Sequence, residues 1–237
     1  MSADLSVLVF AFDEEDNVEP VLAELAAWLD ANEPGAEIVF VDDGSRDATY
    51  ERAAAALSGR PHQLAKHPTN RGMGAAIKTG VALATRGWVT FLPADGQIAP
   101  DAIGTLRRAA APGDVELVLS VYDHRDDGLD RTILSFGVRS LIFLVHGVVM
   151  RSDGPYLFRR TLMDPEQLPP DTFFLNFEVP IRALAAGIRT RTVTIACRPR
   201  LSGSSKVTAL RRIGGVAKDL IDLRRRRLSR ALSMWRR

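Results

Sequence analysis

An acidic segment follows the second of four clear apolar runs, and its residue types and their spacing suit a nucleotide-binding site. The segment is VDDGSRDAT (41–49), and Asp43 stands at the start of its turn. A carboxylate at that position can accept hydrogen bonds from a nucleobase N–H or from ribose hydroxyls. The alternative is that the neighbouring polar residues are ordinary caps and turns, namely Ser45, Asp47 and Thr49.

A second polar pair follows the apolar run at 88–92. Asp95 and Gln97 stand two residues apart in the segment FLPADGQIAP (91–100), on either side of a glycine. A carboxylate and an amide are hard oxygen ligands, which suit Mg²⁺ or Mn²⁺ when phosphates complete the coordination shell. The pair therefore predicts a divalent-metal site.

The glycine-rich segment NRGMGAA (70–76) is in the wrong place for a dinucleotide-binding fingerprint. That fingerprint should follow the first strand, whereas here the first strand runs into FAFDEE (10–15). NAD and FAD are therefore not expected. Glycines at a helix start, Gly72 among them, can still let backbone N–H groups approach a phosphate.

The elements that must position these residues alternate along the first 120 positions. Strand-like apolar runs and segments of helical periodicity follow one another, which predicts an α/β fold with a mostly parallel sheet and helices on both faces. Ligands bind such sheets at the carboxyl ends of the strands. The expected strands are 5–10, 37–41, 62–66, 88–92 and 115–120, and the expected helices are 18–31, 48–57, 75–85 and 101–109.

Beyond position 120 the alternation weakens. A long helix is expected over 131–150, loops with four prolines over 151–172, a helix over 174–186 and a strand over 189–196. Repeats and low-complexity linkers are absent, so one domain over 1–205 and a basic tail over 206–237 are expected.

Composition excludes several classes of protein. A chain that is 46% hydrophobic and 25% charged can bury a core. A single cysteine excludes a disulfide scaffold and a cysteine-based metal site. The N-terminus lacks a basic signal region, and the most apolar later stretch is broken by Arg139 and His146. We expect a cytoplasmic protein, attached peripherally to the inner face of the membrane.

Charge is divided unevenly between the body and the tail. Residues 206–237 carry 11 Lys/Arg and 2 Asp/Glu, a net charge of +9, whereas residues 1–205 carry −7, within a total of +2. The tail interleaves arginines with leucines, an isoleucine and Trp235, which is typical of a basic amphipathic helix on an anionic membrane. The alternative is a solvated tail. Nucleic-acid binding is not expected, because no recognition motif accompanies the arginines.

Together these segments resemble family 2 glycosyltransferases of the GT-A fold, in particular the polyprenyl-phosphate branch that contains dolichol-phosphate mannose synthases. The resemblance runs from about residue 5 to 207. Its six motifs stand in family order as FAFDEE (10–15), VDDGSRDAT (41–49), NRGMGAA (70–76), GPYLFRR (154–160), FFLNFE (173–178) and RLSGSSK (200–206).

The resemblance implies a role for each matching residue. The nucleotide pocket would be lined by Ala11, Phe12, Glu14 and Asp43, and the metal would be held by Asp95 and Gln97. The diphosphate or the acceptor phosphate would be approached by Arg200, Ser205 and Lys206. The family's metal motif often carries a further carboxylate where this chain has Pro93, which cannot ligate.

The implied reaction is inverting transfer of a sugar from a UDP- or GDP-sugar to a polyprenyl phosphate. A hydroxyl acceptor would need a general base, for which Glu178 is the candidate. A phosphate acceptor is already ionised, so Glu178 would then orient groups or pair with Arg200. Other readings are a soluble or protein acceptor, nucleotidyl transfer, or a non-catalytic nucleotide-binding protein at the membrane surface.

Overall fold

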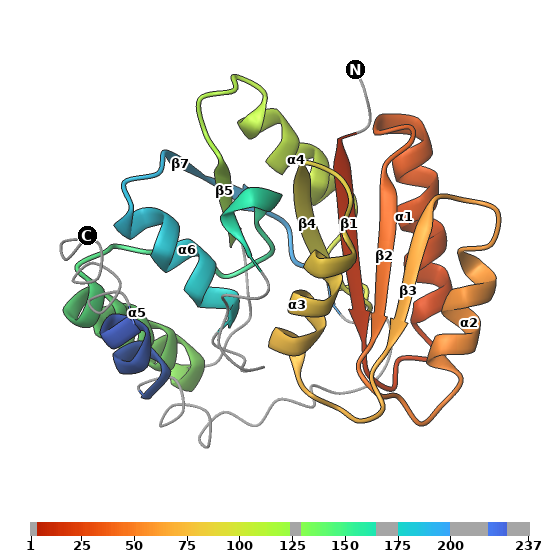
Figure 1. Cartoon of the computed structure of the whole chain (residues 1–237), viewed down its shortest axis with the longest axis horizontal. Coiled ribbons are helices and arrows are strands. Elements are labelled where there is room, and N and C mark those ends of the chain that lie inside the picture. The colour runs from red at the N-terminus through yellow and green to blue at the C-terminus, as the bar shows by residue number, and fades with distance from the viewer. Residues whose placement is uncertain (1–3, 124–128, 165–174, 200–217, 227–237) are drawn as a thin grey trace, which may run out of the picture.

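The computed structural model describes residues 4–123, 129–164, 175–199 and 218–226 (Figure 1). Strands and helices alternate through the first 120 residues, as the apolar pattern predicts. The elements are β1 (Leu5–Ala11), α1 (Val18–Asn32), β2 (Glu37–Asp42), α2 (Thr49–Ala56), β3 (His62–Lys66), α3 (Met73–Leu83), β4 (Trp88–Pro93), α4 (Asp101–Ala110), β5 (Leu117–Tyr122), α5 (Leu129–His146), β6 (Leu157–Arg159), the 3₁₀ helix η1 (Arg160–Leu162), α6 (Leu175–Ala185) and β7 (Thr190–Ile195).

These strands form one sheet in the order β3-β2-β1-β4-β6-β5-β7. Every neighbouring pair is parallel except the two that involve β6, which runs antiparallel to both β4 and β5. The predicted α/β fold with a mostly parallel sheet is confirmed. The segment 151–172, predicted to be rich in loops, also contains β6, which was not predicted because three residues are too few to show an alternating pattern.

Helices cover both faces of the sheet, as expected for parallel strands joined by crossovers. On one face, α1, α2 and α4 bury their apolar sides, with Leu25, Ala53 and Ile103 fully excluded from solvent. On the other face, α3 and α6 contribute Ile77 and Val179. Figure 1 shows α1 and α2 beside the red and orange strands β1, β2 and β3, and α6 beside the green and blue strands β5 and β7.

Tyr156, just before β6, is the largest of the fully buried side chains. Its ring meets Phe91 edge-on at 4.8 Å between centroids. Burial raises the pKa of the phenol above its usual range, so the hydroxyl keeps its proton at neutral pH. Among the described residues this hydroxyl has no hydrogen-bond partner.

A third, smaller core joins the end of the chain to the body. Part of the predicted tail, residues 218–226, is helical, and its Leu220 and Leu223 are fully buried with Ile142 of α5 and Ile181 of α6. From the amphipathic pattern of the tail, these two leucines were expected to contact a membrane. In the structure they pack against the protein. Within the described ranges, none of the helices is both long and apolar enough to cross a bilayer.

Candidate active site

The carboxyl ends of β2, β1 and β4 bring the first motifs to one edge of the sheet. These strands are adjacent and parallel, and backbone bonds continue between them past their last pairs. Asp43 N–H donates to the Ala11 carbonyl at 2.8 Å, and Ala94 N–H donates to the Phe10 carbonyl at 3.0 Å. Ala11 at the end of β1 and the residues just beyond β2 and β4 therefore share this edge (Figure 1).

Reciprocal hydrogen bonds join the loop after β1 to the loop after β2. Asp13 N–H donates to Ser45 Oγ at 2.9 Å, and Arg46 N–H donates back to Asp13 Oδ1 at 2.9 Å. Glu14 N–H donates to Thr49 Oγ1 at 2.8 Å. Asp13 has a φ of 51°, in the left-handed region that residues other than glycine seldom adopt. Ser45 and Thr49 thus make structural bonds between the two loops, whereas the N-cap of α2 is Ala48 and has no side-chain cap.

Phe12 and Glu14, predicted to line the nucleotide pocket, are both half-buried in the first loop. Glu14 Oε2 accepts a hydrogen bond of 2.6 Å from the side-chain amide of Asn17, directly before α1. The Glu14 side chain is therefore held against the start of α1.

The two aspartates of the second motif have different surroundings. Asp42 is fully buried, and its Oδ1 accepts from the backbone N–H and the hydroxyl of Ser45. Its Oδ2 lies 3.4 Å from Lys66 Nζ. These contacts make Asp42 a structural residue that shapes the turn, so Asp43 is the member of the pair that remains a candidate for ligand binding.

Asp43 is oriented by three donors from the segment between β3 and α3. Its Oδ1 accepts from His67 Nδ1 at 2.7 Å and from Arg71 N–H at 2.9 Å, and its Oδ2 accepts from Gly72 N–H at 2.7 Å. Asp43 is buried, with only 4% of the residue exposed. Gly72, expected to approach a phosphate, thus donates its N–H to Asp43.

His67 was missed in the sequence, where a single histidine after a weak strand gives no signal. It is buried, with 5% exposed. Nδ1 donates to Asp43, since a carboxylate only accepts, and Nε2 lies 2.9 Å from Thr79 Oγ1 on α3. Asp43, His67 and Thr79 therefore form a chain from the end of β2 to α3.

Gly44 lets the second loop approach the glycine-rich segment. Its φ is +81°, in the left-handed region that favours glycine. A Cβ at this position would lie 2.4 Å from the carbonyl carbon of Thr69 and 2.7 Å from the nitrogen of Asn70. The sequence at 44 must therefore be glycine for the two motifs to meet.

Asp95 and Gln97 lie in the turn after β4, as predicted. Asp95 is 5% exposed and its Oδ1 accepts from Gln97 N–H at 3.1 Å. The Gln97 carbonyl accepts from Arg198 N–H at 2.7 Å, which ties this turn to the chain beyond β7. Pro93 ends β4 and supplies no ligand.

The Asp95 carboxylate and the Gln97 amide fit a divalent cation that is bound together with phosphates. The described residues contain no cluster of three or more His, Cys, Asp or Glu side chains able to hold a metal by themselves. Mg²⁺ is commonly held by one or two carboxylates, with substrate phosphates and waters completing the shell. A carboxylate and an amide at a strand end match that mode of binding.

Glu178, on α6, is ion-paired inside the protein. Its side chain is fully buried, with Oε1 2.7 Å from Arg182 Nη2 and Oε2 3.2 Å from Arg226 Nη2 of the helix at 218–226. The pair with Arg226 joins α6 to the helix at 218–226, and the pair with Arg182 lies within α6. Three other predicted site residues, Arg200, Ser205 and Lys206, lie outside the described residues.

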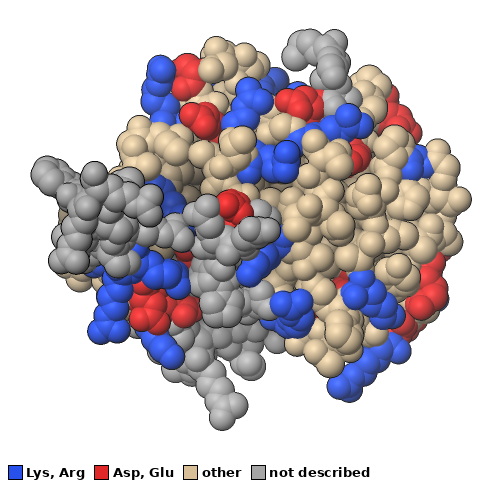
Figure 2. Space-filling view, in the orientation of Figure 1, with Lys and Arg blue, Asp and Glu red and all other residues tan. Residues whose placement is uncertain are grey.

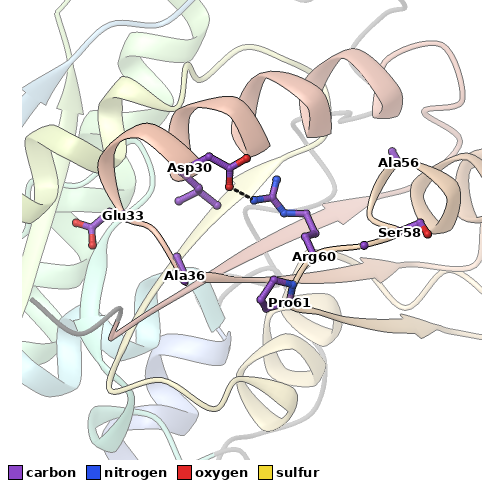
Figure 3. Close-up of a pocket in the computed structure, with 10 residues that line it drawn as sticks. Asp30, Glu33, Ala36, Ala56, Ser58, Arg60 and Pro61 are labelled. Atoms are coloured by element: carbon purple, nitrogen blue, oxygen red, sulfur yellow. Dashed lines mark hydrogen bonds and ion pairs between the residues drawn. The ribbon is translucent and has the colours of Figure 1, made fainter.

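A pocket of about 390 Å³ lies away from this edge (Figure 3). It is lined by the end of α1, with Asp30 and Glu33, and by the residues before β2 and β3, with Ala36 and Pro61. These positions are at the amino ends of the strands. Arg60 and Asp30, joined at 2.6 Å, cross it as an ion pair. None of the predicted site residues lines it.

Comparisons with known proteins agree with the motifs. The family model for glycosyl transferase family 2 matches residues 6–174. The chain is 30% identical over 215 residues to an undecaprenyl-phosphate 4-deoxy-4-formamido-L-arabinose transferase of Pseudomonas fluorescens, covering 88% of this chain and 62% of that protein. It is 28% identical over 239 residues to a dolichyl-phosphate beta-glucosyltransferase of Drosophila melanogaster, covering 87% and 70%.

Solved structures share the fold. The chain superposes with a TM-score of 0.67 on glucosyl-3-phosphoglycerate synthase from Mycobacterium tuberculosis in complex with Mg²⁺ and uridine diphosphate. The two are 20% identical, and the match covers 92% of this chain and 77% of the other. The sheet and its helices therefore have the GT-A fold.

The chain belongs to glycosyl transferase family 2, because the family model matches more than half of it. Its curated relatives include sugar transferases that act on undecaprenyl and dolichyl phosphates, which is the branch that the motifs resemble. The chain spans 62% of the length of the first of these relatives.

Proposed function

We propose that this chain transfers a sugar from a nucleotide-diphosphate sugar to a polyprenyl phosphate at the cytoplasmic face of the membrane, with inversion at the anomeric carbon. One observation carries the proposal. The oriented Asp43 and the Asp95–Gln97 turn both lie at the carboxyl ends of the parallel strands. The curated relatives support the lipid acceptor, since their names specify undecaprenyl or dolichyl phosphate.

Asp43 is the residue proposed to recognise the nucleoside. Oδ1 has two donors and Oδ2 has one among the contacts described above, and a carboxylate oxygen can accept two hydrogen bonds. Oδ2 therefore keeps acceptor capacity for a nucleobase N–H or a ribose hydroxyl. The donors that fix the carboxylate also remove the cost of ordering it when the nucleotide binds.

Asp95 and Gln97 are proposed to hold the divalent cation together with the donor diphosphate. When bound, the cation would neutralise the charge that develops on the leaving diphosphate. Asp95 is held by Gln97 N–H and, through the Gln97 carbonyl, by the chain at Arg198. Arg200, Ser205 and Lys206 follow closely in sequence and are proposed to contact the diphosphate or the acceptor phosphate.

Glu178 is proposed to orient the acceptor side rather than to act as a base. Its carboxylate is fully buried and ion-paired through one oxygen with Arg182 and through the other with Arg226, so both oxygens are engaged inside the protein. A phosphate acceptor is ionised at neutral pH and needs no base, so the reaction does not require proton transfer to Glu178.

The basic residues beyond 206 are proposed to hold the enzyme at an anionic membrane.

The test is a transfer assay with UDP- and GDP-sugars and Mg²⁺ or Mn²⁺, with and without polyprenyl phosphate. We expect transfer that requires the lipid phosphate and is abolished by chelation. Asp95→Asn should lower the rate by about 10²–10³-fold, as expected for loss of an electrostatic contact to the transition state. Asp30→Asn, at an exposed carboxylate at the other end of the sheet, is the control.

Transfer to a soluble acceptor with no lipid dependence would refute the acceptor assignment and favour a soluble-acceptor enzyme. Binding of nucleotide without transfer to any acceptor would favour a non-catalytic protein. Full metal-dependent activity of Asp95→Asn would refute the role of that carboxylate.

A further inference from the structure

The large apolar side chains that the described residues expose are gathered in one region. They are Phe143 (53% exposed) and Leu144 (75%) near the end of α5, Val149 (72%) just beyond it, and Ile221 (47%) in the helix at 218–226. We call these four residues the apolar edge. Soluble surfaces rarely concentrate such side chains without an interaction partner.

Two contacts place Ile221 beside the end of α5. His146 Nε2 donates to the Leu220 carbonyl at 3.1 Å, and Arg224 donates through Nη1 to the Val145 carbonyl. The helix at 218–226 thus covers the last turn of α5, where carbonyl groups lack partners within the helix. The apolar edge therefore combines residues that are distant in sequence but adjacent in the fold.

The inner sides of the same helices are already occupied. Ile142 of α5 and Leu220 and Leu223 of the last helix form the third core and are fully buried. A membrane contact by this part of the chain cannot use those leucines. The apolar contact must come from the outward residues, and the apolar edge provides it.

Exposed cationic side chains stand close in sequence to residues of the apolar edge. Arg151, Lys218 and Arg224 are exposed, and the Arg225 side chain is 78% exposed while it lies 3.6 Å from Asp222. Figure 2 shows Lys and Arg side chains, with a smaller acidic group, in the region where Figure 1 places α5 and residues 218–226. Exposed apolar residues with cationic neighbours match the interface of an anionic bilayer.

We propose that the apolar edge inserts into the headgroup region of an anionic membrane, so that α5 and the helix at 218–226 dock as one unit. The choice of a lipid partner rests on the proposed function. The proposal goes beyond a basic tail that acts alone, because it assigns the apolar contact to Phe143, Leu144 and Val149, which precede α6.

The test is co-sedimentation with vesicles of phosphatidylcholine, with or without phosphatidylglycerol. Leu144→Ser and Val149→Ser remove apolar surface and leave the charge unchanged. Each should weaken binding to the anionic vesicles roughly tenfold, equivalent to about 1.4 kcal/mol. Ala55→Ser, at an exposed position of α2 on the other edge of the sheet, is the matched control and should bind like the unmodified chain.

A measurement on the unmodified chain covers the case in which a variant misfolds. Hydrogen exchange at residues 143–149 should slow when anionic vesicles are added. Unchanged exchange there, or unchanged binding by both serine variants, would overturn the proposal. Loss of a concentration-dependent dimer in Leu144→Ser, with no vesicle binding by the unmodified chain, would assign the surface to self-association instead.

Failure of this proposal can be distinguished from failure of the proposed function. Transfer to a short-chain polyprenyl phosphate dissolved in detergent does not require vesicle binding. The serine variants should keep that activity while losing binding to vesicles. Loss of detergent-phase transfer in the serine variants, with the fold intact, would place these residues in the acceptor site and overturn the membrane role.

Discussion

Replacing His67 with leucine should destabilise the protein and disorder Asp43. The change removes a 2.7 Å bond from the buried imidazole to the Asp43 carboxylate and the contact of 2.9 Å with Thr79. A hydrogen bond to a charged group contributes about 1.5–3 kcal/mol, and leaving the half-buried Thr79 hydroxyl without this contact costs at most a further ~1 kcal/mol. We therefore expect His67→Leu to lower the free energy of unfolding by about 2–4 kcal/mol.

The conservative variant separates the hydrogen bond from the packing. In His67→Asn the amide nitrogen is attached to Cγ, as Nδ1 is, so it can still donate to Asp43. This variant should recover part of the lost stability in urea unfolding. His62→Leu is the matched control, since His62 is a half-buried histidine of β3 whose Nδ1 lies 2.8 Å from the Arg60 carbonyl, away from Asp43.

Nucleotide binding gives the readout that a purely structural role would not move. With Asp43 no longer oriented, the affinity for UDP or GDP, whichever the unmodified chain prefers, should fall about tenfold in His67→Leu, equivalent to about 1.4 kcal/mol. In transfer assays the loss should appear in KM for the donor rather than in kcat. A stable His67→Leu variant with unchanged nucleotide affinity would refute the reasoning.

Three further changes have expected outcomes. Gly44→Ala should cost about 3 kcal/mol in urea unfolding, since its Cβ would lie 2.4 Å from Thr69 at a φ of +81°; unchanged stability would contradict the close approach. Tyr156→Phe should leave the melting temperature unchanged or raise it, because the removed hydroxyl is buried without a described partner; a fall equivalent to ~2 kcal/mol would reveal a partner. Leu223→Ala, at a fully buried side chain, should cost ~2–5 kcal/mol and speed proteolysis after residue 217, whereas Ile221→Ala at 47% exposure should not.

The sequence was sufficient to predict those helices and strands whose apolar residues recur with a regular period. Residues 5–122 alternate between strands and amphipathic helices, and their boundaries lie within a few residues of those expected. The strand-end positions of Asp43 and Asp95 followed from the same pattern, because parallel strands bring their carboxyl ends to one edge. The motifs then indicated the family, which the family model confirms.

The parts that could not be predicted depend on long-range contacts. His67 follows an irregular, half-exposed strand, and only the packing of β3 beside β2 brings it to Asp43. Leu220 and Leu223 lie in a basic amphipathic sequence that fits a membrane surface as well as a protein surface. Their burial depends on apolar residues of α5 and α6, which no local pattern links to the chain end.

The antiparallel strand β6 has a consequence for the order in which the chain assembles. β6 pairs Phe158 with Val89 of β4 and with Leu117 of β5, and so joins the block β3-β2-β1-β4 to the block β5-β7. The two blocks become one continuous sheet only when β6 pairs with both β4 and β5. Until that junction closes, β4 has an open hydrogen-bonding edge, which another chain could pair with.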